Sequence, residues 1–406
     1  MFAPYQLSGK LFVMHPHRPI AAWTHGDKIS GVVVRGLESG RDTLIESPYF
    51  IDATPQGELL ELAQVEHVLG AESSAETGEP HASEQANPQD HQAITVCFAM
   101  DYLPNEDHTI DKPRQYELWR NYSPPGWCGR LFEWTTMRPE TNQPLTRYLF
   151  EAEDDLPWWN FRRILDRTNF ENGFIPSDIT VVNWPQNDYW FGPSLGVDEN
   201  EKRRNFDAAR QLSLSFLYWL QTEAPRSDGG HGYAGLHLRR DVVGGTPDGL
   251  AQAPYIRESR RIKAEFTVLE QHIAHPLRPD GPEIFKDSVG IGCYRIDLHP
   301  RVSGAGYLDL GCWPFQIPLG SLIPIRIENL LPGGKNLGVT HITNGAYRVH
   351  HVEWSIGEAA GFLAAFCLER RLVPRQVRSR PDLLEEFQTL LQHHGIELVW
   401  PSLTPL

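Results

Sequence analysis

Residues 329–367 read NLLPGGKNLGVTHITNGAYRVHHVEWSIGEAAGFLAAFC and combine a glycine turn, a polar segment and a helical pattern. Pro332, Gly333 and Gly334 predict a turn, because glycine tolerates positive φ and lets the backbone approach another group closely. The polar segment after this turn carries amide, hydroxyl, imidazole and guanidinium side chains. These side chains belong to Asn336, Thr340, His341, Thr343, Asn344 and Arg348.

The second half of this stretch predicts a buried helix over residues 355–368. Gly357, Gly361 and Ala365 recur every four positions and so share one helix face. We expect Gly357 and Gly361 to face another backbone segment. The start of such a helix presents free N–H groups and a positive partial charge, which suit an electron-rich or anionic cofactor group. The residues alone leave a tightly packed core helix as the alternative.

The order of Gly334-Lys335-Asn336, a polar segment with His and Arg, and a helix with Gly-Glu-Ala-Ala-Gly resembles the C-terminal signature of FAD-dependent oxidoreductases. These are distantly similar to the flavoproteins of succinate dehydrogenase and fumarate reductase and to the glutathione reductase type of FAD fold. The resemblance implies that Gly334, Lys335 and Asn336 lie near the ribityl and pyrophosphate part of FAD. It also implies that residues 350–353, with His351 and Val352, meet the pyrimidine edge of the flavin, and that Gly357 lies in the same cofactor-binding helix.

The N-terminal part predicts an antiparallel meander followed by a strand and a helix. Short apolar runs at 11–15, 19–23, 28–35 and 43–46 predict strands, of which the last three form the meander. Residues 49–54 predict an apolar strand that ends in Asp52, Ala53 and Thr54, and a helix begins near Gly57. A strand that leads into a helix through small residues is how α/β folds place ligands.

This strand end resembles the Ala-Thr-Gly motif of the same family, although Pro55 stands where glycine is common. The resemblance therefore assigns Asp52, Ala53, Thr54 and Gly57 to cofactor binding. It further predicts that residues 52–54 lie close to residues 334–336 in space.

A GxGxxG fingerprint between a strand and a helix does not occur in this sequence. In the family, the unit that carries it corresponds to a segment before Met1. We therefore expect an α/β, Rossmann-like FAD/NAD(P)-binding domain that lacks its first βαβ unit and carries a large inserted α+β substrate domain. The expected divisions are 1–70 and 301–375 for the FAD-binding domain, 71–300 for the insertion, and 376–406 for a C-terminal surface helix and tail.

The middle of the chain is rich in aromatic residues and ends in a basic cluster. Residues 70–94 are expected to form a surface connection or lid, and residues 95–100 a buried strand. The aromatic residues between 116 and 191 are interpreted mainly as core. The exception is the segment 183–189, NWPQNDY, because it combines amide and acid side chains with two aromatic residues in seven positions. Residues 201–221 predict an amphipathic helix. Residues 261–268 predict a strand, with a helix as the rival interpretation.

The basic residues Arg257, Arg260 and Arg261 have two interpretations. They form ion pairs with the acidic residues of this chain, or they orient an anionic substrate. Further strands are predicted within residues 287–300 and 309–324.

Composition limits the classes of function. The formal net charge of −15 disfavours nucleic acid and anionic membranes as partners. We find neither a signal peptide nor an apolar run of the ~18 residues that a membrane span needs, which favours a cytoplasmic protein. The five cysteines form no CxxC pair and predict free thiols. The pairs His15/His17 and His272/His275 lack a third ligand nearby, so we expect no metal site.

The sequence therefore predicts an FAD-dependent oxidoreductase that acts on a small molecule, anionic or sugar-like. His341, His350 and His351 are candidate acid–base residues, because imidazole titrates near neutral pH. Arg348 is the candidate for stabilising negative charge and resembles the substrate-binding arginine of the fumarate reductase relatives. The alternatives are a non-catalytic remnant or fragment that acts as a binding module, and a carbohydrate-active lyase or hydrolase, although a carboxylate pair is not recognisable.

Overall fold

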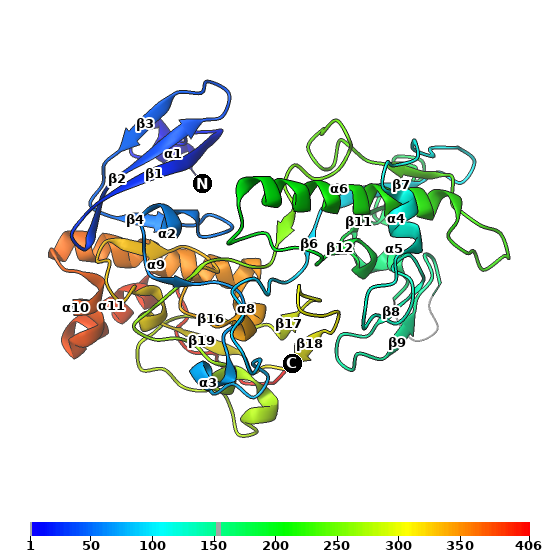
Figure 1. The fold of residues 1–406 in the computed structure, drawn as a ribbon. Helices are drawn as coiled ribbons and strands as arrows, with labels where there is room; N and C mark the ends of the chain where they lie inside the picture. Colours follow the sequence, from blue (N-terminus) through cyan, green and yellow to red (C-terminus); the bar gives the residue numbers. More distant parts are fainter. Residues whose placement is uncertain (1, 152–155) are drawn as a thin grey trace. The chain divides into compact units, whose positions relative to one another are not determined.

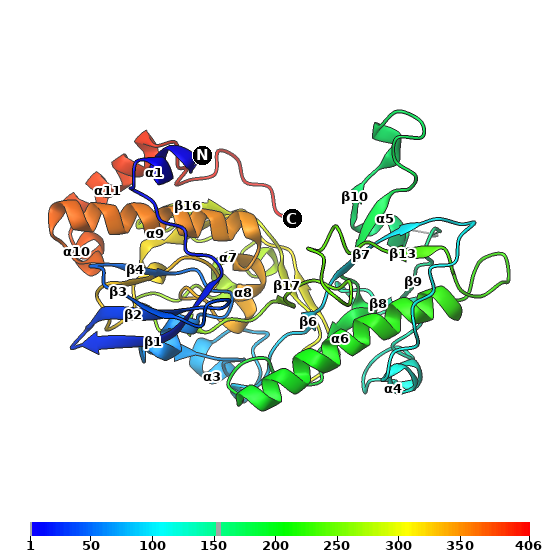
Figure 2. The same cartoon turned by 90° about the horizontal axis from the view of Figure 1, so that it is seen from above.

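The computed structural model describes residues 2–151 and 156–406, which fall into two compact units. The first unit consists of Met1–Val68, Ser259–Tyr294 and Cys312–Leu406, and the second of Leu69–Glu258 and Arg295–Gly311. Residues 259–294 and 376–406 thus belong to the same unit as the N-terminal segment, whereas the sequence divisions place 259–294 within an insertion. Figures 1 and 2 show the course of the chain in each unit.

The N-terminal meander of the first unit is confirmed. Strands β1 (His17–His25), β2 (Lys28–Gly36) and β3 (Asp42–Ile45) form an antiparallel sheet in the order β1-β2-β3 (Figure 1). The strand predicted at 11–15 is wrong. That segment follows helix α1 (Ala3–Leu7) as an irregular stretch in which Phe12 and Val13 are exposed. Pro16 comes directly after it and has no N–H for a strand ladder.

The expected strand at 49–54 and the helix after it are also confirmed. Strand β4 (Phe50–Asp52) pairs in parallel with β20 (Leu330–Pro332), and α2 (Glu58–Leu62) follows β4. Most of the sequence lies between these two strands, so the pair joins an early segment of the chain to a late one. A small apolar core supports the pair and the meander. Its buried members include Ile29, Val32, Leu59, Leu60, Ile262, Ile327 and Leu330.

Helix α9 (His350–Arg370) confirms the helix predicted over 355–368, but its buried face is not the expected one. A β-carbon on Gly357 would lie 3.5 Å from the Gly333 carbonyl oxygen, so Gly357 does face another backbone. Gly361 and Ala365 are exposed, and a β-carbon on Gly361 would meet nothing within 4 Å. The face with larger apolar side chains is buried instead, because it removes more apolar area from water. Its residues are Val352, Ile356, Ala359, Ala360, Leu363, Ala364, Phe366 and Cys367.

The C-terminal helix is part of the core and not the expected surface addition. Helix α10 (Pro374–Ser379) leads into α11 (Pro381–His393), whose Leu383, Phe387 and Leu391 are buried. The rings of Phe366 in α9 and Phe387 lie 5.3 Å apart. An amphipathic pattern of this kind buries its apolar stripe against a neighbouring helix.

The remainder of the first unit contains short elements. The strand predicted at 261–268 is confirmed in preference to a helix, but only Arg261–Ile262 (β15) forms a ladder, with β5 (His67–Val68). The other elements are α7 (Glu270–Ile273), the 3-10 helices η3 (His275–Leu277) and η4 (Leu319–Leu322), and the paired strands β16 (Ser288–Gly292) and β19 (Phe315–Pro318).

Two small sheets organise the second unit. One has the order β10-β11-β7-β13 and the other the order β12-β6-β14. Their strands are β10 (Arg163–Leu165), β11 (Ile179–Val182), β7 (Phe98–Tyr102), β13 (Leu236–Leu238), β12 (Asp188–Tyr189), β6 (Ile94–Thr95) and β14 (Tyr255–Ile256). The buried strand predicted over 95–100 is therefore divided between β6 and β7, one in each sheet.

Helix α6 (Glu199–Thr222) confirms the amphipathic helix predicted over 201–221. The other elements of this unit are short. They are the helices α3 (Ser74–Thr77), α4 (Tyr116–Asn121) and α5 (Trp158–Phe161), the 3-10 helices η1 (Arg167–Asn169) and η2 (Pro185–Asn187), and the hairpins β8–β9 (Thr135–Met137, Pro144–Thr146) and β17–β18 (Ile296–Leu298, Leu308–Leu310).

The core of the second unit is aromatic, as the sequence predicts. Trp119, Trp158, Trp184, Phe216 and Trp219 are almost fully buried and belong to one cluster. Residues 70–94 are only partly a surface connection: 84–89 are exposed, but 90–93 are buried. Within residues 2–151 and 156–406, no helix has the length and apolar character needed to cross a membrane.

Candidate functional site

The predicted proximity of residues 52–54 and 334–336 is confirmed in the first unit. The Gly333 amide donates to the Asp52 carbonyl oxygen over 2.8 Å. The Asn336 side-chain amide donates to the same oxygen over 2.9 Å, across a sequence separation of 284. The carboxyl ends of the parallel strands β4 and β20 are therefore joined by one bifurcated acceptor, at the place where α/β folds bind ligands.

Asp52 fixes the turn between β4 and α2. Its carboxylate accepts hydrogen bonds from the Thr54 amide (2.9 Å), the Thr54 hydroxyl (2.6 Å) and the Leu59 amide (3.1 Å). Burial raises the pKa of the Asp52 carboxyl, and the hydrogen bonds from Thr54 and Leu59 oppose the rise. Gly57 completes the turn with φ of +62°, a conformation that glycine adopts without strain.

The glycine turn after β20 fits closely between β4 and α9. A β-carbon on Gly333 would lie 2.8 Å from Ile51 Cγ2, and one on Gly334 would lie 2.9 Å from Glu353 Oε1. The same carboxylate oxygen of Glu353, in the first turn of α9, accepts from the Lys335 amide over 3.0 Å. A side chain at Gly333 would press on Ile51 and Ala53, and one at Gly334 would displace the Glu353 carboxylate, so the turn, the strand end and the helix start are closely packed together.

Two features at this place fit a polar cofactor. Helix α9 has Val349 as its N-cap, without a side-chain cap, so it lacks the usual acceptor for the free N–H groups of its first turn. Asn336 is 1% exposed, and within the described part of the chain its Oδ1 atom has no hydrogen-bond partner. A buried amide oxygen normally has a donor. A nucleotide-type cofactor that brings donor and acceptor groups against closely packed backbone fits these residues.

The predicted catalytic residues have different environments. His341 begins α8 (His341–Tyr347) and is buried, and Arg348, between α8 and α9, is also buried. His350 and His351 open α9 and are exposed. The His351 Nε2 atom lies 2.8 Å from the Cys293 carbonyl oxygen. Arg348 and His341 are thus held within the fold, while the two adjacent histidines are accessible to solvent.

A parallel strand pair that ends at a glycine turn beside a helix start is compatible with a site for a dinucleotide-type cofactor. The family model described as FAD dependent oxidoreductase matches residues 7–391. The chain therefore belongs to the FAD-dependent oxidoreductase family, its cofactor is FAD, and its general function is that of a flavin oxidoreductase. Searches of curated proteins and of solved structures found no significant match.

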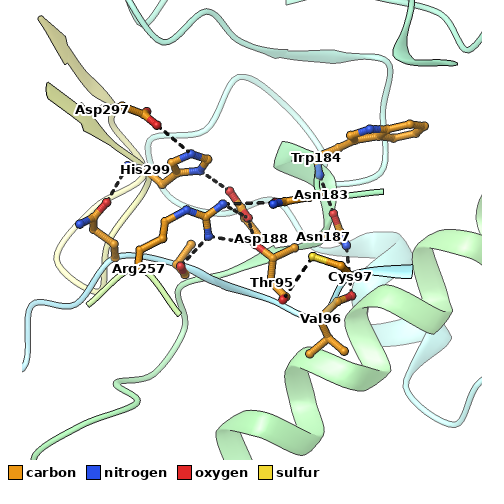
Figure 3. Close-up of polar contacts among 12 residues, drawn as sticks. Thr95, Val96, Cys97, Asn183, Trp184, Asn187, Asp188, Arg257, Asp297 and His299 are labelled. Carbon is orange, nitrogen blue, oxygen red and sulfur yellow. Dashed lines mark hydrogen bonds and ion pairs between the residues drawn. The ribbon is translucent and has the colours of Figure 1, made fainter. Parts of the chain in front are cut away.

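A second polar centre lies in the second unit and is built around Asp188 (Figure 3). Asp188 is fully buried, and its Oδ1 atom lies 3.2 Å from Arg257 Nη2 and accepts from the Thr95 hydroxyl. Its Oδ2 atom lies 2.6 Å from His299 Nδ1. Arg257 also donates to the Ala93 carbonyl oxygen over 2.7 Å. A buried carboxylate is thus matched by a guanidinium, an imidazole and a hydroxyl.

These contacts determine the charge of Asp188. Burial alone raises the pKa of the carboxyl, but the charges of Arg257 and His299 and the hydrogen bonds of His299 and Thr95 outweigh it, so the pKa is lowered. The imidazole of His299 is oriented by Asp188 on one side, and its Nε2 atom lies 3.6 Å from an Asp297 carboxylate oxygen on the other. A carboxylate that contacts one ring nitrogen of a histidine holds the ring in one orientation. The direction in which the other ring nitrogen points is then fixed as well.

Of the two interpretations of the basic cluster Arg257, Arg260 and Arg261, ion pairing within the chain accounts for most of it. Arg257 pairs with Asp188 in the second unit, and Arg260 pairs with Glu61 in the first. Arg261 donates to the Val339 carbonyl oxygen over 3.1 Å. Sequence reasoning singled out 183–189 and Arg257, but it missed His299, because a lone histidine 111 positions from Asp188 gives no local signal.

Proposed function

We propose that this protein oxidises a small organic substrate by transfer of a hydride, or its equivalent, from a substrate C–H bond to FAD. The bound flavin supplies the electron-accepting chemistry, and the protein supplies orientation and electrostatics. The observation that carries the proposal is the joined structure of the β4 end, the glycine turn and the α9 start. Gly333 and Asn336 join the glycine turn to the Asp52 carbonyl oxygen with hydrogen bonds of 2.8 and 2.9 Å, and the Lys335 amide joins the turn to Glu353 of α9 over 3.0 Å.

The residues proposed to hold FAD divide into contacts and supports. Gly334, Lys335 and Asn336 would meet the ribityl and pyrophosphate part, with the Asn336 Oδ1 atom as a buried acceptor. Asp52 and Val352 are buried and act as positioning residues. Ala53, Thr54, Gly57, His351 and Gly357 complete the set through the β4 turn and the first turns of α9.

The catalytic roles are proposed for residues beside these segments. Arg348 would stabilise negative charge that develops on the substrate or the reduced cofactor. His350 is exposed at the start of α9 and can exchange a proton with solvent, so it would accept or return the substrate proton. His341 is buried at the start of α8 and is the second candidate for this proton transfer.

The test has two stages. The purified chain is titrated with FAD while its melting temperature is followed, and ligand binding to the folded state is expected to raise it. At saturating FAD, small organic acids and sugars are then mixed anaerobically with the protein, and loss of the oxidised flavin absorbance is expected with the true substrate. A folded chain whose melting temperature does not respond to FAD at any concentration would contradict the proposal.

A further inference from the structure

Glu353 lies at the junction of the glycine turn and the first turn of α9, within the first unit. Its Oε1 atom accepts a hydrogen bond from the Lys335 amide over 3.0 Å and lies 3.9 Å from the Lys335 ammonium nitrogen. A β-carbon on Gly334 would lie 2.9 Å from the same oxygen. The carboxylate is therefore held against the turn that the proposed function places beside the ribityl and pyrophosphate part of FAD.

The hydrogen-bond donors of this turn are already used inside the protein. The Gly333 amide and the Asn336 side-chain amide both donate to the Asp52 carbonyl oxygen, over 2.8 and 2.9 Å. The Lys335 amide donates to Glu353. A turn that binds a phosphate group instead leaves several N–H groups open and aimed at the anion. These three donors are therefore not free to bind the doubly negative pyrophosphate.

The charges at this place also disfavour a phosphate group. Glu353 is the acidic residue in the first turn of α9, so its charge already complements the positive end of the helix. The Lys335 side chain is only 10% exposed, and its ammonium group balances the same carboxylate. A phosphate group brought here would meet the Glu353 carboxylate, and like charges at close range repel each other.

The same carboxylate suits a ligand that brings hydroxyl groups. The Glu353 side chain is 24% exposed, and among the described residues Lys335 is its one hydrogen-bond or ion-pair partner, through Oε1. An ionised carboxylate accepts through both of its oxygens, so Oε2 can accept a hydrogen bond from a ligand hydroxyl. A ribityl chain carries such hydroxyls and has no charge.

We propose that Glu353 determines which part of FAD lies at the glycine turn. Its carboxylate accepts a hydrogen bond from a ribityl hydroxyl and keeps the pyrophosphate away from the turn. This inference rests on the proposed function, and it makes Glu353 a specificity-determining residue for the cofactor. The carboxylate thereby favours a flavin with a ribityl chain over one without it, and it gives no advantage to an added phosphate.

The test uses three flavins that differ in this part of the molecule. Lumiflavin has a methyl group in place of the ribityl chain, riboflavin has the ribityl chain, and FMN adds a phosphate to it. Their dissociation constants for the full chain are measured at equilibrium by flavin fluorescence. Riboflavin is expected to bind about tenfold more tightly than lumiflavin, the usual effect of one hydrogen bond to a charged group. FMN is expected to bind no more tightly than riboflavin.

Glu353→Gln removes the charge and keeps an acceptor for the Lys335 amide. It should weaken riboflavin binding by roughly five- to tenfold, because a neutral acceptor replaces a charged one, and leave lumiflavin binding unchanged. FMN binding should fall less than riboflavin binding, because the repulsion of the phosphate is removed as well. Glu358→Gln, at an exposed position of the same helix, is the matched control and should change none of the three affinities.

Three results would overturn the proposal. The first is equal binding of lumiflavin and riboflavin by the wild type, and the second is an unchanged riboflavin affinity in Glu353→Gln. The third is an equal loss of lumiflavin and riboflavin binding in Glu353→Gln, since the carboxylate would then only support the glycine turn. If the wild type bound none of the flavins, lumiflavin included, the proposed function itself would be contradicted and this inference with it, so the two failures are distinguishable.

Discussion

At the scale of single residues, Gly333 and Gly361 differ in how closely their surroundings pack, and their sequence context does not reveal this difference. Gly333 has no room for a side chain, since a β-carbon would meet Ile51 Cγ2 at 2.8 Å and Ala53 Cβ at 3.1 Å. Gly361 has open space around it in an exposed helix position. Both lie in the stretch that resembles the FAD motif, and only their tertiary neighbours distinguish them.

We therefore expect Gly333→Ala and Gly361→Ala to change stability in opposite directions. Gly333→Ala should destabilise the protein by about 1–3 kcal/mol through overpacking, and it should also reduce FAD retention. Gly361→Ala should stabilise it by ~0.5–1 kcal/mol, because alanine is the better helix former. Urea unfolding, together with an equilibrium FAD titration of each protein, checks both, and equal effects of the two changes would contradict the close packing of the glycine turn.

Asp188 gives a prediction for the pH dependence of stability. Its pKa is lowered in the folded state, so its ionised form stabilises the fold above the pKa of an unfolded aspartate, about 3.9. This contribution is lost as the pH falls from that value through the folded-state pKa. Asp188→Asn should cost about 3–5 kcal/mol at neutral pH, because it leaves the Arg257 charge buried without its partner.

The check is the free energy of unfolding as a function of pH for both proteins. The difference between wild type and Asp188→Asn should be constant from about pH 5 upward and shrink in more acidic solution. The matched control is Asp42→Asn, because Asp42 pairs with Arg35 on the exposed meander over 2.6 Å and its loss should have little effect. A difference that grows on acidification would show that the pair is not ionic.

Arg348 tests the proposed catalytic role. Arg348→Ala, measured at saturating FAD, should lower turnover by ~10²-fold or more while flavin occupancy changes far less, since a cation aimed at developing charge acts mainly in the transition state. Arg18→Ala, which removes an exposed guanidinium from strand β1, is the control and should leave turnover unchanged. Retained turnover together with lost flavin in Arg348→Ala would assign this residue to cofactor binding.

At the scale of elements, helix α11 shows how an apolar stripe decides a helix's place. Leu383, Phe387 and Leu391 recur at spacings of four and are buried, so the helix contributes to the core of the first unit. Phe387 contacts Phe366 of α9, the helix whose start belongs to the candidate FAD site. The C-terminal segment thus supports the helix whose first turns we propose as part of the FAD site.

Accordingly, Phe387→Ala should destabilise the first unit by about 3–5 kcal/mol, the usual effect of removing a fully buried aromatic ring. Thr389→Ala, at an exposed position of the same helix, is the control and should change stability by less than ~0.5 kcal/mol. Thermal unfolding followed by circular dichroism provides the measurement. If the Phe387→Ala protein were as stable as the control, α11 would be a surface helix that contributes little to the core.

At the scale of the whole molecule, the parallel pair of β4 and β20 joins segments from both ends of the chain into one unit. FAD would be held there by the strand ends, the glycine turn and the α9 start. The 406 residues contain no GxGxxG turn between a strand and a helix, and their formal charge is −15. The doubly negative pyrophosphate is normally met by N–H groups at such a turn.

We therefore expect the 406-residue chain alone to bind FAD weakly, so that most of the flavin separates from it on gel filtration. The measurement is the flavin absorbance that elutes with the protein, compared with a titration at equilibrium, where weak binding should still be seen. The control is Gly333→Ala, which should lose the equilibrium binding as well. Stoichiometric flavin after gel filtration would show that these residues meet the pyrophosphate by themselves.

The sequence by itself determined the local structure wherever a short-range pattern was sufficient. The meander between residues 17 and 45, the helix α6 and the strand end at Asp52 follow from alternation, helical period and turn residues. The proximity of Asp52 and Asn336 was predictable only from the family resemblance, because no local pattern connects positions 284 apart.

Only the tertiary structure decided which residues of a pattern face a partner. Gly357 and Gly361 share one helical period, but Gly333 lies beside Gly357 alone, and the larger apolar side chains of α9 take the buried face. The centre of Asp188, Arg257 and His299 likewise depends on segments brought together by the fold. Burial and charge pairing are properties of neighbours in space, and a single sequence records only neighbours along the chain.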